Sequence, residues 1–527
     1  MAMKQAWLKN IRKGLAIVFF VFSLVIFLDF TGLIPQHADH WMTFIQFTPS
    51  LIEFIHLLSI TSVGFLIVIV LTLLFGRVYC SVLCPAGIFQ DVVIFAHRKI
   101  RKKRKFRHLK ARNILRLTIL AVILLSVAAG TMALVNLLDP YSLFGRITVE
   151  LFRPAAIAIN NLLALIFESI NNYSFKPVEI RSFKAGPFIV AMMFLGILVI
   201  FPLLRGRQYC NTLCPVGTVL GYLSKLSLYR IGLDKVRCTQ CGDCMFTCKA
   251  GCIDVKNRTV DLSRCIACFN CLTVCSANGI HYAPSLKKTA GDVSMEKPDL
   301  SKRNFFLTSA LLLGSVASVS GQHRYRQGGQ GRGWHLHGER HDMLPVSPPG
   351  SVSHQHFTRA CTGCFLCVSA CPTQVLQPAL AAYGWEGLFQ PVMDYKVSFC
   401  NYDCVVCTEV CPTAALLPLT VEEKKQVQLG KARFIKRECI VHTKNTACGA
   451  CSEHCPTKAV QMVPYISGLT IPEVTPDICI GCGACEYACP TDPKAIVVDA
   501  NPIHLTALLP DETKEEEEID YKEEFPF

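Results

Sequence analysis

CTQCGDCMFTCKAGCIDVKNRTVDLSRCIACFNCLTVC, residues 238–275, holds two copies of the cysteine pattern C-x2-C-x2-C-x3-C. Three thiolates at this spacing suit three irons of one cubane, and the fourth cysteine typically ligates the other cluster of a two-cluster ferredoxin. A zinc site is not favoured, because zinc needs only four ligands, usually as two separated pairs. The pattern therefore predicts two [4Fe–4S] clusters, with the ligand sets Cys238, Cys241, Cys244, Cys275 and Cys265, Cys268, Cys271, Cys248.

The composition predicts membrane spans. The chain has 527 residues, of which 51% are hydrophobic and 17% charged, and its mean hydropathy is +0.37. This is too apolar for a soluble protein, and the length favours more than one domain. The 29 cysteines fall almost wholly into runs with iron–sulfur spacing, whereas disulfide scaffolds are short secreted chains. Because cysteines bind iron as thiolates, the sites are expected to assemble under reducing conditions.

Basic residues are concentrated in one run, HRKIRKKRKFRHLKAR, at residues 97–112. Because much of the net charge of +14 lies there, we predict no nucleic-acid binding. The positive-inside rule places the run in the cytoplasm, where it either attracts anionic lipid headgroups or only sets the topology. Residues 139–186 are then predicted to lie outside, with an amphipathic helix near residues 147–170. Four spans are predicted, at residues 15–34, 57–75, 114–138 and 187–204.

An internal repeat follows the second and fourth predicted spans: GRVYCSVLCPAG at residues 76–87 and GRQYCNTLCPVG at residues 206–217. On a helix, the two cysteines of each copy lie one turn apart on one face. If the copies pack as a pseudo-twofold pair, four thiolates meet at the inner face of the membrane. They then hold a further iron–sulfur centre, form two reversible disulfides, or flank a quinone. This possible additional redox or metal site comprises Cys80, Cys84, Cys210 and Cys214.

Two other residue types recur in the repeat. Arg77 and Arg207 either stabilise anions at this site or extend to lipid headgroups. Tyr79 and Tyr209 are predicted to be interfacial anchors.

Residues 300–320 begin with SKRNFFL and continue as a short apolar run. This segment is either a twin-arginine-like export signal, with Lys in place of the first Arg, or a plain fifth transmembrane helix. Both alternatives place the chain after about residue 320 outside the cytoplasm. Residues 321–359 are rich in Gly, Arg, His, Pro and Ser and are predicted to be a flexible linker. A solvated tether is favoured over metal binding for its histidines, His323, His335, His337, His341, His354 and His356.

A second cysteine-rich region spans residues 360–510, and an acidic tail follows at residues 511–527. Four quartets, each ending C-x3-C-P, predict four more [4Fe–4S] clusters. Exchange of the fourth ligand between paired quartets gives the sets Cys361, Cys364, Cys367, Cys411; Cys400, Cys404, Cys407, Cys371; Cys439, Cys448, Cys451, Cys489; and Cys479, Cys482, Cys485, Cys455. With the repeat cysteines, only Cys252 is left over, and it is predicted to be a small buried hydrophobe.

The predicted fold is an α-helical membrane domain with two α+β ferredoxin-like iron–sulfur domains. The membrane domain covers residues 1–217, with four spans, and the helix at 300–320 is a fifth. The first iron–sulfur domain, residues 218–290, is predicted to be cytoplasmic. The second, residues 360–510, is predicted to be extracytoplasmic.

Residues 1–290 resemble the NapH-type membrane ferredoxins of the periplasmic nitrate reductase system, on the basis of four spans, two C-x3-C-P tails and a double ferredoxin motif. NosR-type proteins share the tails and the double cluster. Residues 300–510 resemble the NapG/MauM group of exported four-cluster ferredoxins. The chain thus resembles a fusion of two proteins that are usually separate. The resemblance implies quinol oxidation at the bacterial inner membrane, with electrons passed to a periplasmic reductase.

The sequence therefore predicts a membrane-bound electron-transfer protein that carries six [4Fe–4S] clusters and acts as a quinol dehydrogenase component in anaerobic respiration. Its predicted partners are the membrane quinol pool and a periplasmic reductase, of nitrate or nitrous oxide type, or the small electron carrier of that reductase. A redox regulator and a maturation or repair factor for a periplasmic metalloenzyme are the alternatives. His56 is a candidate quinone contact or, as an alternative, an interfacial residue. The pattern does not locate the quinone site.

Overall fold

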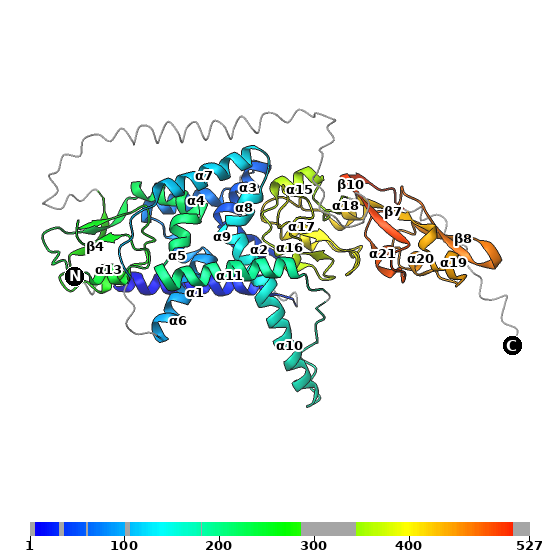
Figure 1. Cartoon of the computed structure of the whole chain (residues 1–527), viewed down its shortest axis with the longest axis horizontal. Helices are drawn as coiled ribbons and strands as arrows, with labels where there is room; N and C mark the ends of the chain where they lie inside the picture. The colour runs from blue at the N-terminus through cyan, green and yellow to red at the C-terminus, as the bar shows by residue number, and fades with distance from the viewer. Residues whose placement is uncertain are drawn as a thin grey trace.

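The computed structural model describes residues 6–30, 36–59, 62–100, 106–180, 182–285 and 344–509. The predicted fifth helix at 300–320, the acidic tail and the histidines His323, His335, His337 and His341 lie outside these residues. A helical domain forms the centre of the molecule (Figure 1). The first cysteine domain, residues 228–285, lies at one end of the helical domain, and the second cysteine domain, residues 344–509, lies at the other.

The helical domain contains long apolar helices and several short buried ones. Its elements are α1 (Ala6–Leu28), α2 (Gln36–Phe44), α3 (Phe47–Leu57), α4 (Gly64–Phe75), α5 (Tyr79–Val82), α6 (Pro85–Ile100), α7 (Asn113–Ala128), α8 (Ala133–Leu138), α9 (Pro140–Ile147), the π-helical η3 (Thr148–Phe152), α10 (Arg153–Glu168), α11 (Ala185–Arg205), the π-helical η4 (Tyr209–Leu213), α12 (Pro215–Leu223) and η5 (Ser224–Leu226).

Three described helices are long and apolar enough to cross a membrane: Trp7–Leu28, Pro140–Glu168 and Ala185–Arg205. Gly64–Phe75 and Asn113–Ala128 are apolar but shorter. These helices are consistent with a membrane protein, while the four-span arrangement stays a prediction.

Two predicted spans are interrupted in the structure. The span predicted at 57–75 begins only at Gly64, because α3 ends at Leu57 and the residue that follows, Leu58, is in the left-handed conformation (φ 49°). The span predicted at 114–138 is divided into α7 and α8, with Gly130 at φ 84° between them. Apolar composition alone did not reveal either break.

The helix predicted near residues 147–170, within the segment 139–186, begins earlier in the structure and is continuous from Pro140 to Glu168. Asp139 caps its first turn, and Pro140 stands at the first helical position, which tolerates proline. Pro154 lies inside the continuous helix, directly after the π-helical segment η3. All eight residues of α9 are buried. By contrast, α10 projects away from the other helices (Figure 1) and exposes apolar side chains, which suit contact with lipid.

Both cysteine domains are built from two-stranded antiparallel sheets and short helices. In the first, β1 (Tyr229–Leu233) pairs with β4 (Ile280–Pro284), so that Ile231 faces Tyr282. Its other elements are β2 (Ile253–Asp254), β3 (Thr259–Val260), α13 (Asp243–Thr247) and η6 (Asn270–Thr273). These small hairpins agree with the predicted ferredoxin-like α+β construction.

The second cysteine domain pairs β5 with β6, β7 with β10 and β8 with β9. Its strands are β5 (Leu376–Gln377), β6 (Val392–Met393), β7 (Val427–Phe434), β8 (Val460–Pro464), β9 (Thr470–Val474) and β10 (Ile496–Thr506). Its helices are α15 (His354–Ala360), α16 (Leu366–Ala370), α17 (Val406–Glu409), α18 (Val421–Gln426), η7 (Lys436–Glu438), α19 (Ile440–Lys444), α20 (Ala450–Glu453), η8 (Ile466–Gly468) and α21 (Ala484–Ala488).

The predicted flexible linker, residues 321–359, extends too far into this domain. Residues 344–359 are folded onto it, and Ser351 is fully buried. The His354 ring lies 4.8 Å from the Tyr383 ring, and His356 Nε2 lies 2.8 Å from the Ala414 carbonyl oxygen. These two histidines are therefore structural parts of the domain and not members of a solvated tether.

One continuous buried core joins the three parts of the molecule. It extends from the first cysteine domain through the helical domain into the first half of the second cysteine domain. The second half of that domain, which contains Cys439 and Cys489, has a core of its own. Buried cysteines of the first cysteine domain, the helical domain and the first half of the second cysteine domain thus belong to the same core.

Candidate iron–sulfur sites

The first cysteine domain contains two cavities, each lined by one predicted ligand set. Leu233, Val255 and Ile280 contribute apolar surface to the first cavity, and Ile231 and Ile253 do so in the second. Residues with positive φ, such as Gln240, Gly242 and Ala267, curve the cysteine loops around them. The cysteines of the first cavity are Cys238, Cys241, Cys244 and Cys275, and those of the second are Cys248, Cys265, Cys268 and Cys271.

The leftover cysteine, Cys252, also lines the second cavity. It is buried, as predicted, but its Sγ lies 3.5 Å from Cys248 Sγ. The prediction missed this proximity because Cys252 falls outside the four-cysteine pattern. The position of Cys252, four residues after Cys248, was the only indication in the sequence that the two sulfurs could lie close together.

Two cavities of the second cysteine domain are lined by two more predicted sets. One is surrounded by Cys371, Cys400, Cys404 and Cys407. The other is surrounded by Cys439, Cys448, Cys451 and Cys489.

The thiols of each of the remaining two sets affect one another's pKa. Burial raises the pKa of the Cys367 thiol, and the neighbouring thiols Cys361, Cys364 and Cys411 raise it further. Burial likewise raises the pKa of Cys485, with added contributions from Cys482, Cys479 and Cys455. Thiols that raise one another's pKa are close in space, and a bound metal would supply the positive charge that stabilises them as thiolates.

All six predicted sets are therefore brought together. Among the described residues, no three His, Cys, Asp or Glu side chains are gathered closely enough to hold a single metal ion. Cysteines spread around an apolar cavity suit the several irons of a cubane. The ligand assignment itself stays a prediction.

The four repeat cysteines lie together in the helical domain, and each is at most 4% exposed. The two copies exchange arginines: Arg77 Nη2 donates to the Cys210 carbonyl oxygen at 3.2 Å, and Arg207 Nη1 donates to the Cys80 carbonyl oxygen. This reciprocal contact pairs the two copies, which is the condition under which the four thiolates were expected to meet. Burial raises the pKa of the thiols of Cys84, Cys210 and Cys214.

The structure removes one of the two alternatives for the repeat arginines and corrects the prediction for the repeat tyrosines. Arg77 and Arg207 are fully buried and do not extend to headgroups. Tyr79 and Tyr209 are 2% exposed, so they are not interfacial anchors. The Tyr79 hydroxyl donates to Gln46 Oε1 at 3.0 Å, and the Tyr209 hydroxyl donates to the Leu138 carbonyl oxygen at 2.9 Å.

A buried carboxylate beside the repeat cysteines was not predicted. Asp91 forms ion pairs with Arg207 at 2.8 Å, Arg12 at 3.2 Å and Lys249 at 3.2 Å. Burial would raise the pKa of the Asp91 carboxyl, but Arg207, Lys249 and Arg12 together lower it below its usual range. The signal in the sequence was a lone acidic residue in an otherwise apolar and basic helix, α6.

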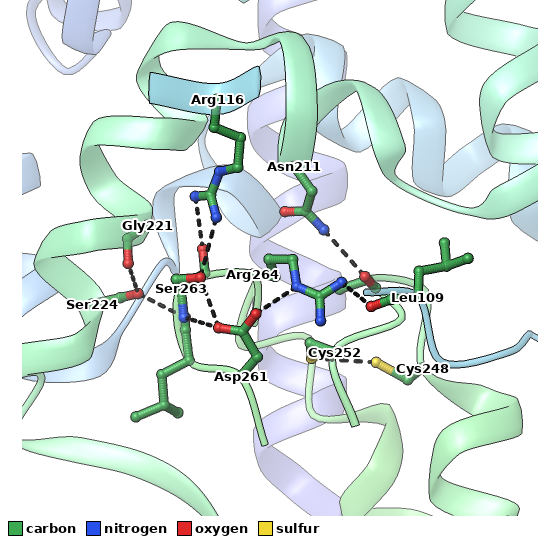
Figure 2. A network of polar contacts seen from close by, with 12 residues as sticks. Leu109, Arg116, Asn211, Gly221, Ser224, Cys248, Cys252, Asp261, Ser263 and Arg264 are labelled. Atoms are coloured by element: carbon green, nitrogen blue, oxygen red, sulfur yellow. Dashed lines mark hydrogen bonds and ion pairs between the residues drawn. The ribbon is translucent and has the colours of Figure 1, made fainter. Parts of the chain in front are cut away.

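Polar contacts fix the first cysteine domain to the helical domain (Figure 2). Arg116 donates to Ser263 Oγ at 3.1 Å and to the Ser263 carbonyl oxygen at 3.3 Å. Asn211, from the second repeat, donates to the Ala250 carbonyl oxygen at 3.2 Å, and Ser224 donates to the Leu262 carbonyl oxygen at 2.8 Å. The loop that precedes Cys265 is thus held against α7, η5 and the second repeat.

Replacing Arg116 by Met is expected to weaken this docking by about 1–3 kcal/mol, because two Ser263 groups lose hydrogen bonds at a buried interface. Hydrogen exchange at residues 259–266 should accelerate. The sheet formed by β7 and β10 in the second cysteine domain serves as an internal control and should keep its protection. Unchanged exchange at 259–266 would show that Arg116 does not hold the domains together.

The helical domain contacts the second cysteine domain at a cysteine loop. Gly145 lies so close to the Cys364 carbonyl oxygen that an added Cβ would overlap it. Arg153 Nη2 donates to the Ser369 carbonyl oxygen at 2.9 Å, and the Arg146 guanidinium lies 4.6 Å from the centre of the Phe389 ring. His56, the candidate quinone contact, lies with its ring 5.5 Å from that of His356 at the same junction.

Comparison with known families identifies iron–sulfur domains in both halves of the chain. A model described as "4Fe-4S binding domain" matches residues 59–104 and 186–233. Models described as "4Fe-4S dicluster domain" match residues 261–375, 360–416 and 446–492. The chain therefore carries [4Fe–4S] domains of ferredoxin type, as predicted.

Several ferredoxin-type proteins are similar to parts of the chain. "Ferredoxin-type protein NapF" of Escherichia coli (strain K12) is 27% identical over 136 residues, which are 26% of this chain and 74% of NapF. "Methylamine utilization ferredoxin-type protein MauM" of Paracoccus denitrificans (strain Pd 1222) is 34% identical over 148 residues, 27% of this chain and 64% of that protein.

A third relative, "Methylamine utilization ferredoxin-type protein MauN" of Methylobacillus flagellatus, is 26% identical over 175 residues, 33% of this chain and 48% of MauN. No solved structure matches the chain. The ferredoxin-type resemblance is confirmed, and the fusion with a NapH-type protein stays a prediction.

Proposed function

We propose that this protein is a membrane-bound iron–sulfur electron-transfer protein that passes electrons from quinol to a periplasmic terminal reductase, of nitrate or nitrous oxide type, or to its small electron carrier. One observation carries the proposal. The cysteine sites at the two ends of the helical domain belong to one buried core, which runs through that domain. A protein with redox sites at both ends of a domain of apolar helices is suited to move electrons from one end to the other.

The residues around each predicted set support cluster binding. When bound, a [4Fe–4S] cluster would accept and release one electron at a time. The protein buries the cysteines among apolar side chains and aims backbone N–H groups at their sulfurs. Gly279 N lies 3.3 Å from Cys275 Sγ, and Ala432 N lies 3.4 Å from Cys479 Sγ. Such hydrogen bonds and the exclusion of water set the reduction potential of a bound cluster.

The placement of the two cysteine domains supports a transmembrane route. They lie at opposite ends of the helical domain (Figure 1), and the described residues include three helices of membrane-spanning length. The basic run at 97–112 favours a cytoplasmic first cysteine domain and therefore a periplasmic second one. The similarity to NapF and MauM, both named as ferredoxin-type proteins, supports electron transfer and leaves the acceptor to be identified.

The quinol step can be tested by mixing the intact chain with a quinol. The protein is purified anaerobically in detergent and its clusters are oxidised, after which a short-chain quinol is added. We expect the iron–sulfur absorbance to bleach, because quinol supplies the electrons. The quinone with the same side chain is the matched control and should cause no bleaching.

Dithionite added to a second sample defines the full absorbance change. Full bleaching with dithionite and none with quinol would contradict quinol oxidation. A redox regulator or a repair factor for a periplasmic metalloenzyme would then fit the clusters better.

A further inference from the structure

We propose that Cys80, Cys84, Cys210 and Cys214 together hold one further iron–sulfur centre, with one pair of ligands from each repeat. Its position between the two cysteine domains makes it a relay within the proposed electron route. The relay role rests on the proposed function, whereas the binding of iron by these four cysteines does not.

Buried positive charge is the first argument. Arg77 and Arg207 are fully buried. Asp91 is shared by Arg207 and two further cations, and none of the described hydrogen-bond partners of Arg77 is a carboxylate. Buried cations are costly unless a negative charge lies nearby. Four thiolates around an iron–sulfur core carry net negative charge, and they would balance the excess that the side chains leave.

The hydrogen bonds to the four sulfurs are the second argument. Arg77 Nη2 lies 3.6 Å from Cys80 Sγ, and Gln90 Nε2 lies 3.4 Å from Cys210 Sγ. The backbone N–H of Gly217 lies 3.3 Å from Cys214 Sγ, and that of Gly87 bonds the Cys84 sulfur.

Each sulfur thus receives one N–H donor. The predicted cluster ligands Cys361 and Cys489 show the same feature, with backbone N–H groups at 3.4 Å. A thiolate ligand benefits from such donors, whereas a disulfide sulfur has little use for them. All four repeat cysteines are free thiols in the structure.

Contacts on both sides of the four cysteines are the third argument. Toward the first cysteine domain, the guanidinium that contacts Cys80 also donates from Nη1 to the Ser263 carbonyl oxygen at 3.0 Å, two residues before Cys265. Toward the second cysteine domain, the Tyr209 hydroxyl donates a hydrogen bond to the Leu138 carbonyl oxygen. Helix α9 begins two residues after Leu138, and its Gly145 packs against the loop that contains Cys364. The four cysteines therefore stand between a predicted ligand of each domain.

The family comparison agrees with this assignment. The segments 59–104 and 186–233, which match the model described as a 4Fe-4S binding domain, contain no cysteines other than these four. Neither segment supplies enough ligands alone, so a shared site of two plus two is required. In the relay, two-electron oxidation of a quinol to a quinone, with release of two protons, would supply two successive one-electron transfers through the centre to the second cysteine domain.

The test compares the intact wild-type chain with the double variant Cys80→Ser/Cys210→Ser, both purified anaerobically. Iron and acid-labile sulfide are counted per chain, and the reduced proteins are examined by electron paramagnetic resonance. The variant is expected to lose up to about four irons and one set of signals. An unchanged iron content and spectrum in the double variant, or zinc bound in place of iron, would overturn the proposal.

Thr72→Val is the control for a change inside the helical domain at a residue outside the two repeat copies. Thr72 is fully buried in α4, and its hydroxyl donates to the Val68 carbonyl oxygen of the same helix at 2.8 Å. This variant should keep the wild-type iron content and spectrum. Equal losses of iron in Thr72→Val and in the double variant would show that the loss reflects damage to the helices, and would also count against the proposal.

A gentler variant covers the case in which the double variant does not fold. Gln90→Leu keeps all four cysteines and removes the amide that lies 3.4 Å from Cys210 Sγ. Loss of an N–H donor to a ligand sulfur should shift one reduction potential downward and leave the others in place. If every potential stays unchanged, the centre is not there. Because neither readout involves quinol, a failure of quinol bleaching would remove the proposed function and leave this site standing.

Discussion

Replacing Asp91 by Asn is expected to lower the free energy of unfolding by about 3–5 kcal/mol, because it leaves three buried or nearly buried cations without their shared partner. Arg12, Arg207 and Lys249 converge on this carboxylate from three different parts of the chain. The asparagine side chain retains hydrogen-bonding capacity but not the charge. The thermal unfolding midpoint of the detergent-purified protein should fall markedly.

Asp403→Asn is the matched control for this variant. Asp403 forms an ion pair with Lys425 at 2.9 Å, but its side chain is 66% exposed. An exposed pair of this kind contributes little to stability, because solvent screens it. Equal losses of stability in the two variants would show that burial does not strengthen the Asp91 network.

The stability difference between wild type and Asp91→Asn should depend on pH in one direction only. Because the folded-state pKa of Asp91 is lowered, its contribution is fully present above the unfolded-state pKa of about 3.9 and is lost as the pH falls through the folded-state value. The difference should therefore be constant between about pH 6 and 8 and shrink only in acid. A difference that grows on acidification would contradict this linkage.

The second large effect is expected at Gly217. An added Cβ there would overlap the Cys210 carbonyl oxygen and crowd Arg77 Nη2. The overlapping atom belongs to the backbone, so it cannot move away by a side-chain rotation. Gly217→Ala should therefore lower the free energy of unfolding by about 3 kcal/mol or more and displace the second repeat from the first. If the four repeat cysteines bind iron, the same variant should lose that iron.

Gly196→Ala separates this clash from the general effect of alanine. Gly196 lies in α11, and an added Cβ meets nothing within 4 Å. In that open position, alanine is expected to be neutral or to stabilise the helix by about 0.5–1 kcal/mol. A loss of stability at Gly196 as large as at Gly217 would refute the steric argument.

The cysteine spacing predicted which thiols gather, because the spacing of ligands along a loop limits what they can surround. For that reason the pattern alone pairs Cys238 with Cys275, although the two lie far apart in the sequence, and both line one cavity. The spans were less predictable. Apolar composition could not locate the break at Gly130 or show that the apolar helix at Pro140–Glu168 continues through a π segment.

The polar surroundings of the sites were the least predictable part. The partners of Asp91 and Gln90 lie on other segments of the chain, so the local sequence around these residues does not predict the contacts. The same holds for Arg77 and Arg207, which alone would suit a headgroup contact. Their burial follows from the reciprocal bonds to Cys210 and Cys80, and these bonds exist only once both repeats are packed.

The three-cation network around Asp91 also has a consequence for synthesis. Arg12 lies in α1, which leaves the ribosome long before Lys249, the residue directly after Cys248 in the first cysteine domain. The ion pair between Asp91 and Lys249 can therefore form only after the segment of the first cysteine domain that contains Lys249 has been translated and folded. A nascent chain that stopped before residue 249 would hold an incomplete charge set in its interior, which ties maturation of the helices to that of the cysteine domain.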